Sequence, residues 1–273
     1  MKIFVLGASG MLGKYVSTYL SSKYEVININ RDRLDAASVS QEELHAILYH
    51  LDVKENDVLI NCMGTIKPRV DALGDLNAIL VNSAFPRKLA NVAELMKAQL
   101  IHPTTDCVYS GLKGSYNEND KYDVSDVYGM TKAMGEPSNC TVIRTSIIGE
   151  EVGQGRSLVE WVKSMKGKEA FGFTNHFWNG VTCLQFAKIC EHLINTGLFW
   201  KGIKHIHSNT LNKQELVEAL NNSYNLGITV IPKETPVKCD RSMSSINDFT
   251  EFNIPSLEAQ IIEMQEFSEI LYS

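Results

Sequence analysis

The feature that most constrains the fold is a regular alternation of short apolar runs with helical stretches over the first 150 residues. The apolar runs are KIFVLG (2–7), YEVINI (24–29), DVLINCMG (57–64), QLIHPTTD (99–106) and CTVIRTSII (140–148). Helical stretches at 11–22, 41–51 and 76–98 separate them. This alternation predicts a parallel sheet covered on both faces, a doubly wound α/β fold. Such a sheet binds its ligand at the carboxyl ends of its strands.

After about residue 150 the pattern becomes mostly helical. Helices are expected at 156–167, 183–195, 213–224 and 254–271, with strand-like pieces at 203–208 and 227–231. We therefore expect a Rossmann-like domain over residues 1–150 and a smaller, mostly helical substrate-binding lobe over 151–273. The boundary is approximate, and segments of the two parts can interleave. A lobe packed beside a doubly wound sheet creates a cleft between them.

Composition argues against several classes of function. The 26 basic and 32 acidic residues give a net charge of −6 without long runs of either sign, which argues against a nucleic-acid surface. No apolar stretch approaches the roughly 20 residues of a membrane span, and the chain begins directly with a strand. Six scattered cysteines lack any C-x-x-C pair. We therefore expect reduced thiols in a cytoplasmic protein and no metal site.

A glycine-rich segment, GASGMLG (7–13), joins the first strand to the first helix. Its spacing is G-x-x-G-x-x-G. Glycines permit a tight turn, and the N-terminus of the helix offers N–H groups to a pyrophosphate. A turn of this length can be a simple connection, but its place after an N-terminal strand favours cofactor binding. The residues expected to contact a dinucleotide here are Gly7, Ser9, Gly10, Met11 and Leu12.

The end of the second strand, NINRDRLD, bears on the choice of cofactor. An acidic residue at this place favours NAD through the ribose 2′-hydroxyl, whereas an arginine suits the 2′-phosphate of NADP. Asn30 is neutral, Arg31 follows it, and Asp32 complicates the choice. We expect NADP(H) rather than NAD(H), with Arg31 at the phosphate. A solvated surface position for Arg31 is the alternative.

The segment DVYGMTKAMGE (126–136) carries Tyr128 and Lys132 four positions apart, which places both on one face of a helix. Taken alone, this is compatible with an ordinary surface pair. Thr105 ends the fourth strand at the edge where the cleft is expected. A tyrosine with an unperturbed pKa of about 10 is a poor proton carrier, and a lysine cation beside it lowers that pKa. The three residues together can reduce a carbonyl group with hydride from a nicotinamide.

Several motifs, in order and spacing, resemble the dTDP-4-dehydrorhamnose reductase branch of the extended short-chain dehydrogenase/reductase superfamily. They are MKIFVLGASGMLGKYV, DVLINCMG, VNSAFPRKLA, TTDCVYSG, DVYGMTKAMGE and VIRTSIIG. The resemblance covers residues 1 to about 150 and continues more loosely through GFTNHFWNGVT and KCDRSMSS. Thr104 departs mildly from it, since the family usually has serine there.

The resemblance implies an NAD(P)H-dependent oxidoreductase that reduces a 4-keto (deoxy)sugar nucleotide, with a nucleotide-diphosphate sugar as its partner. Thr105, Tyr128 and Lys132 would be catalytic, and Tyr128 would deliver the proton. The resemblance also implies that Asp35 and Ala36 contact the adenine. Cys62, Met63 and Gly64 would line the cofactor groove.

Other activities of the superfamily stay open. Dehydration is disfavoured, because Cys107 stands where the dehydratases carry a glutamate after Asp106. An epimerase-reductase similar to GDP-fucose synthase would use Cys107 with His176. A buried filler is the commoner role for a free cysteine, and His176 also suits substrate hydrogen bonding. A regulatory subunit that binds NADP(H) without turnover is a third reading, against which the complete Thr-Tyr-Lys set argues.

The lobe offers fewer signals. The segment TNHFWNGVT (174–182) combines groups that suit a nucleotide and a sugar: Asn175, His176, Trp178 and Asn179. Packing is the alternative role for the tryptophan. Arg241 suits the substrate diphosphate or an exposed surface, and Lys67 with Arg69 follows the third strand towards the anionic ligand. The nucleotide, the sugar and the oligomeric state, a homo-oligomer included, stay open.

Overall fold

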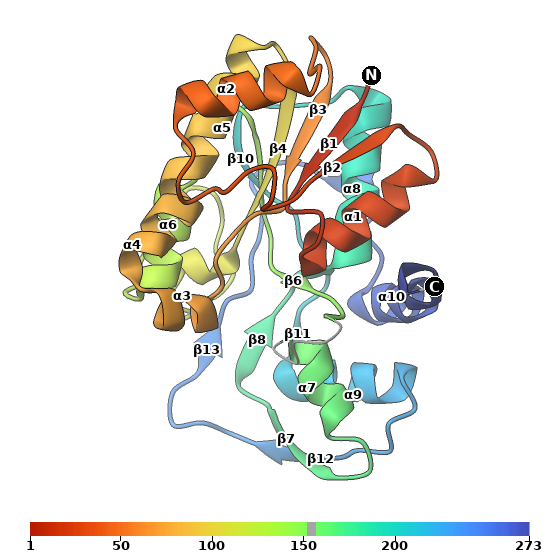
Figure 1. The fold of residues 1–273 in the computed structure, drawn as a ribbon. Coiled ribbons are helices and arrows are strands. Elements are labelled where there is room, and N and C mark those ends of the chain that lie inside the picture. The colour runs from red at the N-terminus through yellow and green to blue at the C-terminus, as the bar shows by residue number, and fades with distance from the viewer. Residues whose placement is uncertain (152–156, 273) are drawn as a thin grey trace.

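The computed structural model describes residues 1–151 and 157–272, which form an α/β part and a smaller lobe below it in Figure 1. Within those residues, one six-stranded parallel sheet has the order β10-β5-β4-β3-β1-β2. Its strands are β1 (Ile3–Leu6), β2 (Val26–Ile29), β3 (Val58–Asn61), β4 (Gln99–Thr104), β5 (Thr141–Arg144) and β10 (Gly202–His205). The predicted doubly wound fold is confirmed.

Two helical layers cover the two faces of this sheet (Figure 1). The covering helices are α1 (Met11–Ser21) and α8 (Cys183–Thr196) on one face and α2 (Gln41–His50) and α5 (Phe85–Leu95) on the other. In β1, Ile3 and Val5 pack in the core of the first layer. Phe4 and Leu6 pack in the core of the second. Successive side chains of a strand point to opposite faces, so a strand covered on both sides is a continuous apolar run.

The expected helix at 76–98 is helical but not uniform. Its first turn, α4 (Asp75–Ala78), leads into the wider π-helical turn η1 (Ile79–Ala84) and then into α5. Pro86 lies at the start of α5 and has no N–H to donate to the carbonyl of Asn82 four residues earlier. The widened turn is therefore a consequence of this proline. Such turns often occur at functional sites.

Further elements of the α/β part stand near the carboxyl edge of the sheet: α3 (Lys67–Leu73), the 3-10 turn η2 (Asp106–Val108), α6 (Val127–Met134) and β6 (Ile147–Ile148), which pairs with β9 (Val181–Thr182). Helix α3 was not expected from the sequence. Gly74, with φ of +83°, separates it from α4. The expected helix around Tyr128 is present as α6.

The lobe contains short strands as well as helices: α7 (Leu158–Ser164), β7 (Glu169–Phe173), β8 (His176–Trp178), β11 (Leu211–Asn212), α9 (Lys213–Ser223), β12 (Thr229–Lys233) and β13 (Cys239–Asp240). Strand β8 pairs with β11 on one side and β13 on the other, and β7 pairs with β12. The C-terminal helix α10 (Leu257–Tyr272) packs against α9 and α8. A short 3-10 turn, η3 (Thr250–Phe252), precedes it.

Two features of this half differ from the expected pattern. The strand-like piece at 203–208 supplies β10, which extends the large sheet beside β5 instead of staying in the lobe. The segment 174–182, expected as a loop, contains β8 and β9. Residue 156, the first of the expected helix 156–167, lies outside the described residues.

Among the residues that the structure describes, every helix is too short or too polar to cross a lipid bilayer. In the same residues, His, Cys, Asp and Glu side chains form no group of three or more suited to a metal ion.

Candidate functional site

The glycine turn after β1 brings the start of α1 close against the preceding backbone. Gly7 adopts φ of +79°, a conformation that suits glycine. A Cβ on Gly13 would lie 2.1 Å from the carbonyl oxygen of Gly7, so only glycine allows the helix to pack this closely. Gly10, which has no side chain, stands at the N-cap of α1. The N–H groups of the first helical turn are thereby left for a ligand.

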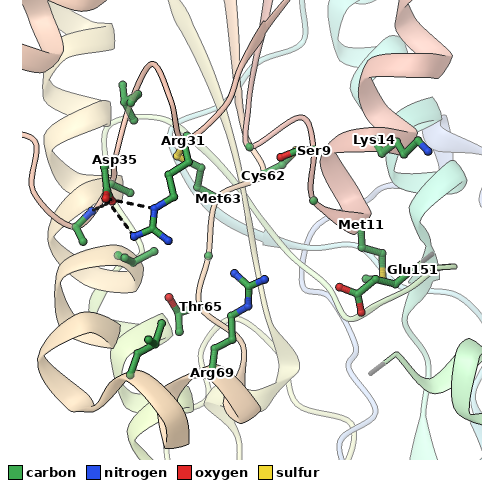
Figure 2. A pocket seen from close by; sticks show the side chains of 18 of the residues that line it. Ser9, Met11, Lys14, Arg31, Asp35, Cys62, Met63, Thr65, Arg69 and Glu151 are labelled. Carbon is green, nitrogen blue, oxygen red and sulfur yellow. Dashed lines mark hydrogen bonds and ion pairs between the residues drawn. The ribbon is translucent and has the colours of Figure 1, made fainter. Parts of the chain in front are cut away.

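A cleft of about 480 Å³ opens over this turn, as Figure 2 shows. A second cleft of about 390 Å³ shares part of its wall, including Gly10, Met11 and residues 62–65. The residues expected to bind the cofactor each line one or both clefts: Gly7, Ser9, Gly10, Met11, Leu12, Arg31, Asp35, Ala36, Cys62, Met63, Gly64, Tyr128 and Lys132. The structure therefore gathers this whole set around one continuous depression.

Arg31 and Asp35, assigned separate roles from the sequence, form an ion pair at the rim of the first cleft. Nη2 of Arg31 lies 3.2 Å from Oδ2 of Asp35, and 75% of the arginine side chain is exposed. The hydrogen bond from the N–H of Ala37 holds the pKa of Asp35 below its usual value, and the smaller effect of Arg31 acts in the same direction. Figure 2 shows the guanidinium group of Arg69 directed towards the same region from α3. Two guanidinium groups thus face this end of the cleft.

Thr105, Tyr128 and Lys132 meet in the second cleft. Helix α6 places Tyr128 and Lys132 one turn apart, and Thr105 directly follows β4. Asp126 caps α6 by accepting a hydrogen bond from the N–H of Gly129 at 2.9 Å. The carboxyl edge of the sheet therefore holds a hydroxyl, a phenol and an ammonium beside the groove that runs from the glycine turn.

The pKa values of the pair correct one expectation. Burial raises the pKa of Tyr128, and its hydrogen bond with Thr105 acts in the opposite direction without cancelling that effect. Burial also lowers the pKa of Lys132 to about 8, although the negative charge of Glu136 acts to raise it. In the protein alone, desolvation thus outweighs the expected lowering of the phenol pKa by the lysine cation. Tyr128 is a neutral phenol at neutral pH, and Lys132 is mostly protonated.

Asn82, which was not assigned a role from the sequence, holds the walls of the second cleft together. Its side-chain oxygen accepts from the N–H of Thr65 at 2.8 Å, and its amide donates to the carbonyl of Thr65 at 2.9 Å. The same amide donates to Oγ1 of Thr131 on α6 at 3.3 Å. Asn82 thus fixes the segment after β3 relative to the helix of Tyr128. Its signal was the asparagine of the motif VNSAFPRKLA, one of the motifs that carry the family resemblance.

The lobe residues Trp178 and Asn179 are buried structural residues, contrary to the expectation that they face a ligand. Trp178 is 5% exposed and packs in the apolar core of the lobe. Asn179 is 2% exposed, and its amide group makes hydrogen bonds of 2.7 and 2.9 Å to the backbone of Met243. Asn175 makes similar bonds to the backbone of Thr235. The side chains of these three residues thus hold the lobe together.

Cys107 and His176 have different neighbours. Nε2 of His176 lies 2.7 Å from Oγ1 of Thr235, whereas Sγ of Cys107 lies 3.9 Å from Nη1 of Arg241. Burial and the nearby Asp106 raise the pKa of the Cys107 thiol to about 12. A thiol with this pKa is uncharged at neutral pH, so almost no thiolate is present to act as a base.

The two basic residues after β3 point to different places. Lys67 forms an ion pair of 3.2 Å with Asp126, so it bridges α3 to the start of α6. Arg69 lines both clefts. Of the two, Arg69 is therefore the better placed to meet an anionic ligand.

A model of the family described as the RmlD substrate binding domain matches residues 1–170. Among curated proteins, dTDP-4-keto-6-deoxy-D-glucose reductase of Streptomyces niveus is 30% identical over 151 residues, which is 52% of this chain and 51% of that protein. dTDP-4-dehydrorhamnose reductase of Aggregatibacter actinomycetemcomitans is 29% identical over 150 residues, 54% of this chain and 49% of that protein. The chain thus spans about half the length of the curated relatives it matches.

Two solved structures are similar over nearly the whole chain. A dTDP-4-dehydrorhamnose reductase of Clostridium acetobutylicum has a TM-score of 0.80 and 20% identity, covering 98% of this chain and 100% of that one. The dTDP-4-dehydrorhamnose reductase of Bacillus anthracis in complex with NADP has a TM-score of 0.80 and 19% identity, covering 98% and 99%. At these identities the likeness establishes the fold. Because the family match covers 170 of 273 residues, the chain belongs to the RmlD substrate binding domain family.

Proposed function

We propose that this protein reduces the keto group of a nucleotide-diphosphate sugar with a nicotinamide dinucleotide as hydride donor. The observation that carries the proposal is the continuity of the two clefts. One begins at the glycine turn, the other ends at Thr105, Tyr128 and Lys132, and both share the wall around Cys62 and Met63. A dinucleotide with its pyrophosphate at the turn would extend towards these three residues.

The dinucleotide is supported by the shape of the turn. Gly13 lets the start of α1 pack against the backbone of Gly7. No side chain caps α1 at Gly10, so its first N–H groups can bind a pyrophosphate. We infer NADP(H) rather than NAD(H), because Arg31 and Arg69 bring two guanidinium groups to the cleft. A guanidinium group matches the geometry of a phosphate. In this proposal Arg31 leaves Asp35 for the 2′-phosphate.

The proposed chemistry uses the protein groups as they are charged at neutral pH. When bound, a reduced nicotinamide supplies the hydride to the carbonyl carbon. Thr105, whose hydroxyl donates to Oδ1 of Asp106 in the structure, would turn that hydrogen bond to the carbonyl oxygen of the substrate. The neutral phenol of Tyr128 gives that oxygen its proton. Lys132, mostly protonated with a pKa of about 8, stabilises the phenolate that remains. The raised pKa of Tyr128 keeps the phenol protonated before the reaction and at the same time weakens it as an acid.

The substrate class is supported by the names of the relatives. The Streptomyces niveus protein is a dTDP-4-keto-6-deoxy-D-glucose reductase, so 4-keto-6-deoxy sugars of dTDP are the first substrates to test. Arg241 is proposed to contact the diphosphate. The epimerase-reductase alternative is weakened because Cys107 contacts Arg241 while His176 contacts Thr235.

The test follows the absorbance of NADPH after addition of dTDP-4-keto-6-deoxyglucose, with dTDP-glucose, which has no keto group, as the control. NADPH should be consumed only with the keto sugar. UDP and GDP keto sugars, tested in parallel, identify the nucleotide. Tight binding of NADPH without turnover of any of these sugars would favour a regulatory subunit and contradict the proposal.

A further inference from the structure

Glu136 is a buried carboxylate that the proposed reaction does not use. It lies four residues after Lys132, just beyond the end of α6, and the residue is 6% exposed. Nε of Arg144 donates to its Oε1 at 3.0 Å, and Nη2 of Arg144 donates to its Oε2 at 2.6 Å. The hydroxyl of Tyr122 also donates to Oε2, at 2.7 Å. These hydrogen bonds fix the carboxylate in position.

The carboxylate of Glu136 and the ammonium of Lys132 reach neighbouring places on the sheet. Nζ of Lys132 donates to the carbonyl of Pro103 on β4 at 3.4 Å. The next residue of β4, Thr104, is paired in register with Arg144 of β5, which holds the carboxylate. Adjacent strands lie about 4.8 Å apart. The two opposite charges therefore meet the sheet one strand apart, and Glu136 forms its ion pair with Arg144 instead of Lys132.

Three other titratable side chains around Lys132 are uncharged at neutral pH. Cys107 of η2 has a pKa of about 12. Tyr128, on the same helix as Lys132, has a raised pKa and is a neutral phenol. Burial, followed by the charge of Lys132, lowers the pKa of His102 on β4, so its imidazole is neutral as well.

Charged side chains on the elements around α6 have other partners or lie in solvent. Asp106 of η2 is a second buried carboxylate, and its Oδ1 accepts a hydrogen bond from Thr105. Arg87 of α5 donates to two backbone carbonyls at the end of α6. The charged residues of α3 and α4 are exposed, and solvent screens them more than buried charges: Lys67, Arg69, Asp71 and Asp75. Glu136 is accordingly the carboxylate that most favours the charged form of Lys132.

We propose that Glu136 is a positioning residue that keeps the ammonium of Lys132 charged, while Arg144 holds the carboxylate away from direct contact with it. This inference rests on the proposed function, in which that ammonium stabilises the Tyr128 phenolate. A direct ion pair would draw the ammonium away from the second cleft, which it lines. A carboxylate held one strand away favours the charge and leaves the ammonium at the cleft.

The competing explanation is that Glu136 only anchors the end of α6 to the sheet. The two explanations differ in the pH dependence that they predict. A carboxylate about 10 Å from an amine, at an effective dielectric constant of about 20, raises the amine pKa by about 1. Loss of the carboxylate should therefore move the alkaline decline of activity from about pH 8 to about pH 7. A loosened helix end should lower activity at every pH instead.

The experiment measures single-turnover reduction of a keto sugar nucleotide, at saturating NADPH, from about pH 6 to about pH 9. Glu136→Gln removes the charge and Glu136→Asp keeps it. Glu191→Gln is the matched control, because Glu191 pairs with Lys23 at 2.7 Å and belongs to α8, on the face of the sheet opposite α5. Glu136→Gln should be about threefold slower than wild type at about pH 7.5 and nearly equal to it at about pH 6. The other two variants should keep the wild-type decline.

A second readout needs no turnover: acetic anhydride labels an amine only in its uncharged form, and mass spectrometry follows the labelling of Lys132 against pH. The labelling curve of Glu136→Gln should move to lower pH by about 1. A thermal melt verifies folding, because this variant leaves Arg144 buried without its carboxylate. If it is unfolded, the double variant Glu136→Gln with Arg144→Met replaces it and should move both curves in the same direction.

The outcomes for Glu136 and for the proposed function can be told apart. A folded variant without the carboxylate that keeps the wild-type decline and the wild-type labelling curve would overturn the inference, even if the protein reduces keto sugars. A loss of activity that is equal at every pH would overturn it as well. A labelling curve that moves to lower pH, without turnover of any keto sugar by wild type, would support the role of Glu136 and reject the proposed function.

Discussion

Lys132 allows a prediction that separates stability from activity. Its side chain is buried, with the residue 9% exposed, and its ammonium makes one long hydrogen bond of 3.4 Å to the carbonyl of Pro103. Burial lowers its pKa from 10.5 to about 8. At about 1.4 kcal/mol per pKa unit, this difference corresponds to roughly 3 kcal/mol by which folding disfavours the charged amine. The proposed catalytic cation is therefore held at a cost in stability.

Replacing Lys132 with methionine keeps an unbranched, apolar chain that is one atom shorter and removes the charge. At neutral pH the free energy of unfolding should rise by up to about 3 kcal/mol. The loss of the stabilising interactions with Pro103 and Glu136 reduces this gain. Turnover of a keto sugar nucleotide should fall sharply, because no cation remains to stabilise the Tyr128 phenolate. A more stable but inactive variant is the expected outcome.

The pH dependence follows from the lowered pKa of Lys132. Between pH 8 and 10.5 the unfolded chain still holds a proton that the folded chain has released, so wild-type stability rises with pH across this window. Lys132→Met has no such proton, and the stability difference between the two proteins should close as the pH rises. Below about pH 8 the difference should be constant.

Urea unfolding at about pH 7 and about pH 10 measures both effects. The reasoning would be refuted if Lys132→Met were less stable than wild type at neutral pH. It would also be refuted if the stability difference were the same at both pH values.

Three further predictions concern the proposed reaction. Tyr128→Phe should reduce single-turnover reduction by about 10²- to 10⁴-fold with an unchanged melting temperature; a folded variant with wild-type turnover would rule out Tyr128 as the proton donor. Cys107→Ser should retain most of the reductase activity, and the product formed by wild type in heavy water should carry no deuterium at a ring carbon. Deuterium that appears with wild type but not with the variant would instead support epimerisation. Arg31→Ala should weaken NADPH in a fluorescence titration and leave NADH unchanged, and equal loss for both would remove Arg31 from the 2′-phosphate.

The α/β half could be predicted from the sequence because its signals are local. Strand β1 is apolar at each position from Ile3 to Leu6, and a strand with that pattern must be covered on both faces. The glycine turn and the pair Tyr128 and Lys132 each lie within one short segment. Parallel topology then brings the carboxyl ends of β1, β3 and β4 to the same edge, and the motifs meet there.

The lobe was harder to predict because its elements are short and their partners are distant in sequence. Trp178 ends a three-residue strand whose neighbours start at Leu211 and Cys239. A strand of this length has too few residues to show alternation, so an indole beside two asparagines was interpreted as a ligand-binding loop. Lys213 begins the polar run KQE, which is typical of an exposed helix start, yet its ammonium lies 5.2 Å from the centre of the Trp178 ring.

The direction of the Tyr128 pKa could not be predicted either, since it depends on two opposing effects. The sequence identifies Lys132 as a neighbouring charge but not how deeply the phenol is buried. Burial dominates in the folded protein. Proximity in a motif therefore indicates which charges interact, while the packing around them decides which protonation state is favoured.

The non-catalytic residues at the end of DVYGMTKAMGE explain how the catalytic ones are held in place. A Cβ on Gly135 would lie 1.7 Å from the carbonyl oxygen of Asn82, so α6 ends in direct contact with the widened turn before α5. Glu136 forms a buried ion pair of 2.6 Å with Arg144 on β5. The segment is thus fixed to the helical layer and to the sheet within two residues. Because Lys132 lies one turn before these contacts, its ammonium stays at the carboxyl edge of the sheet despite the cost of its burial.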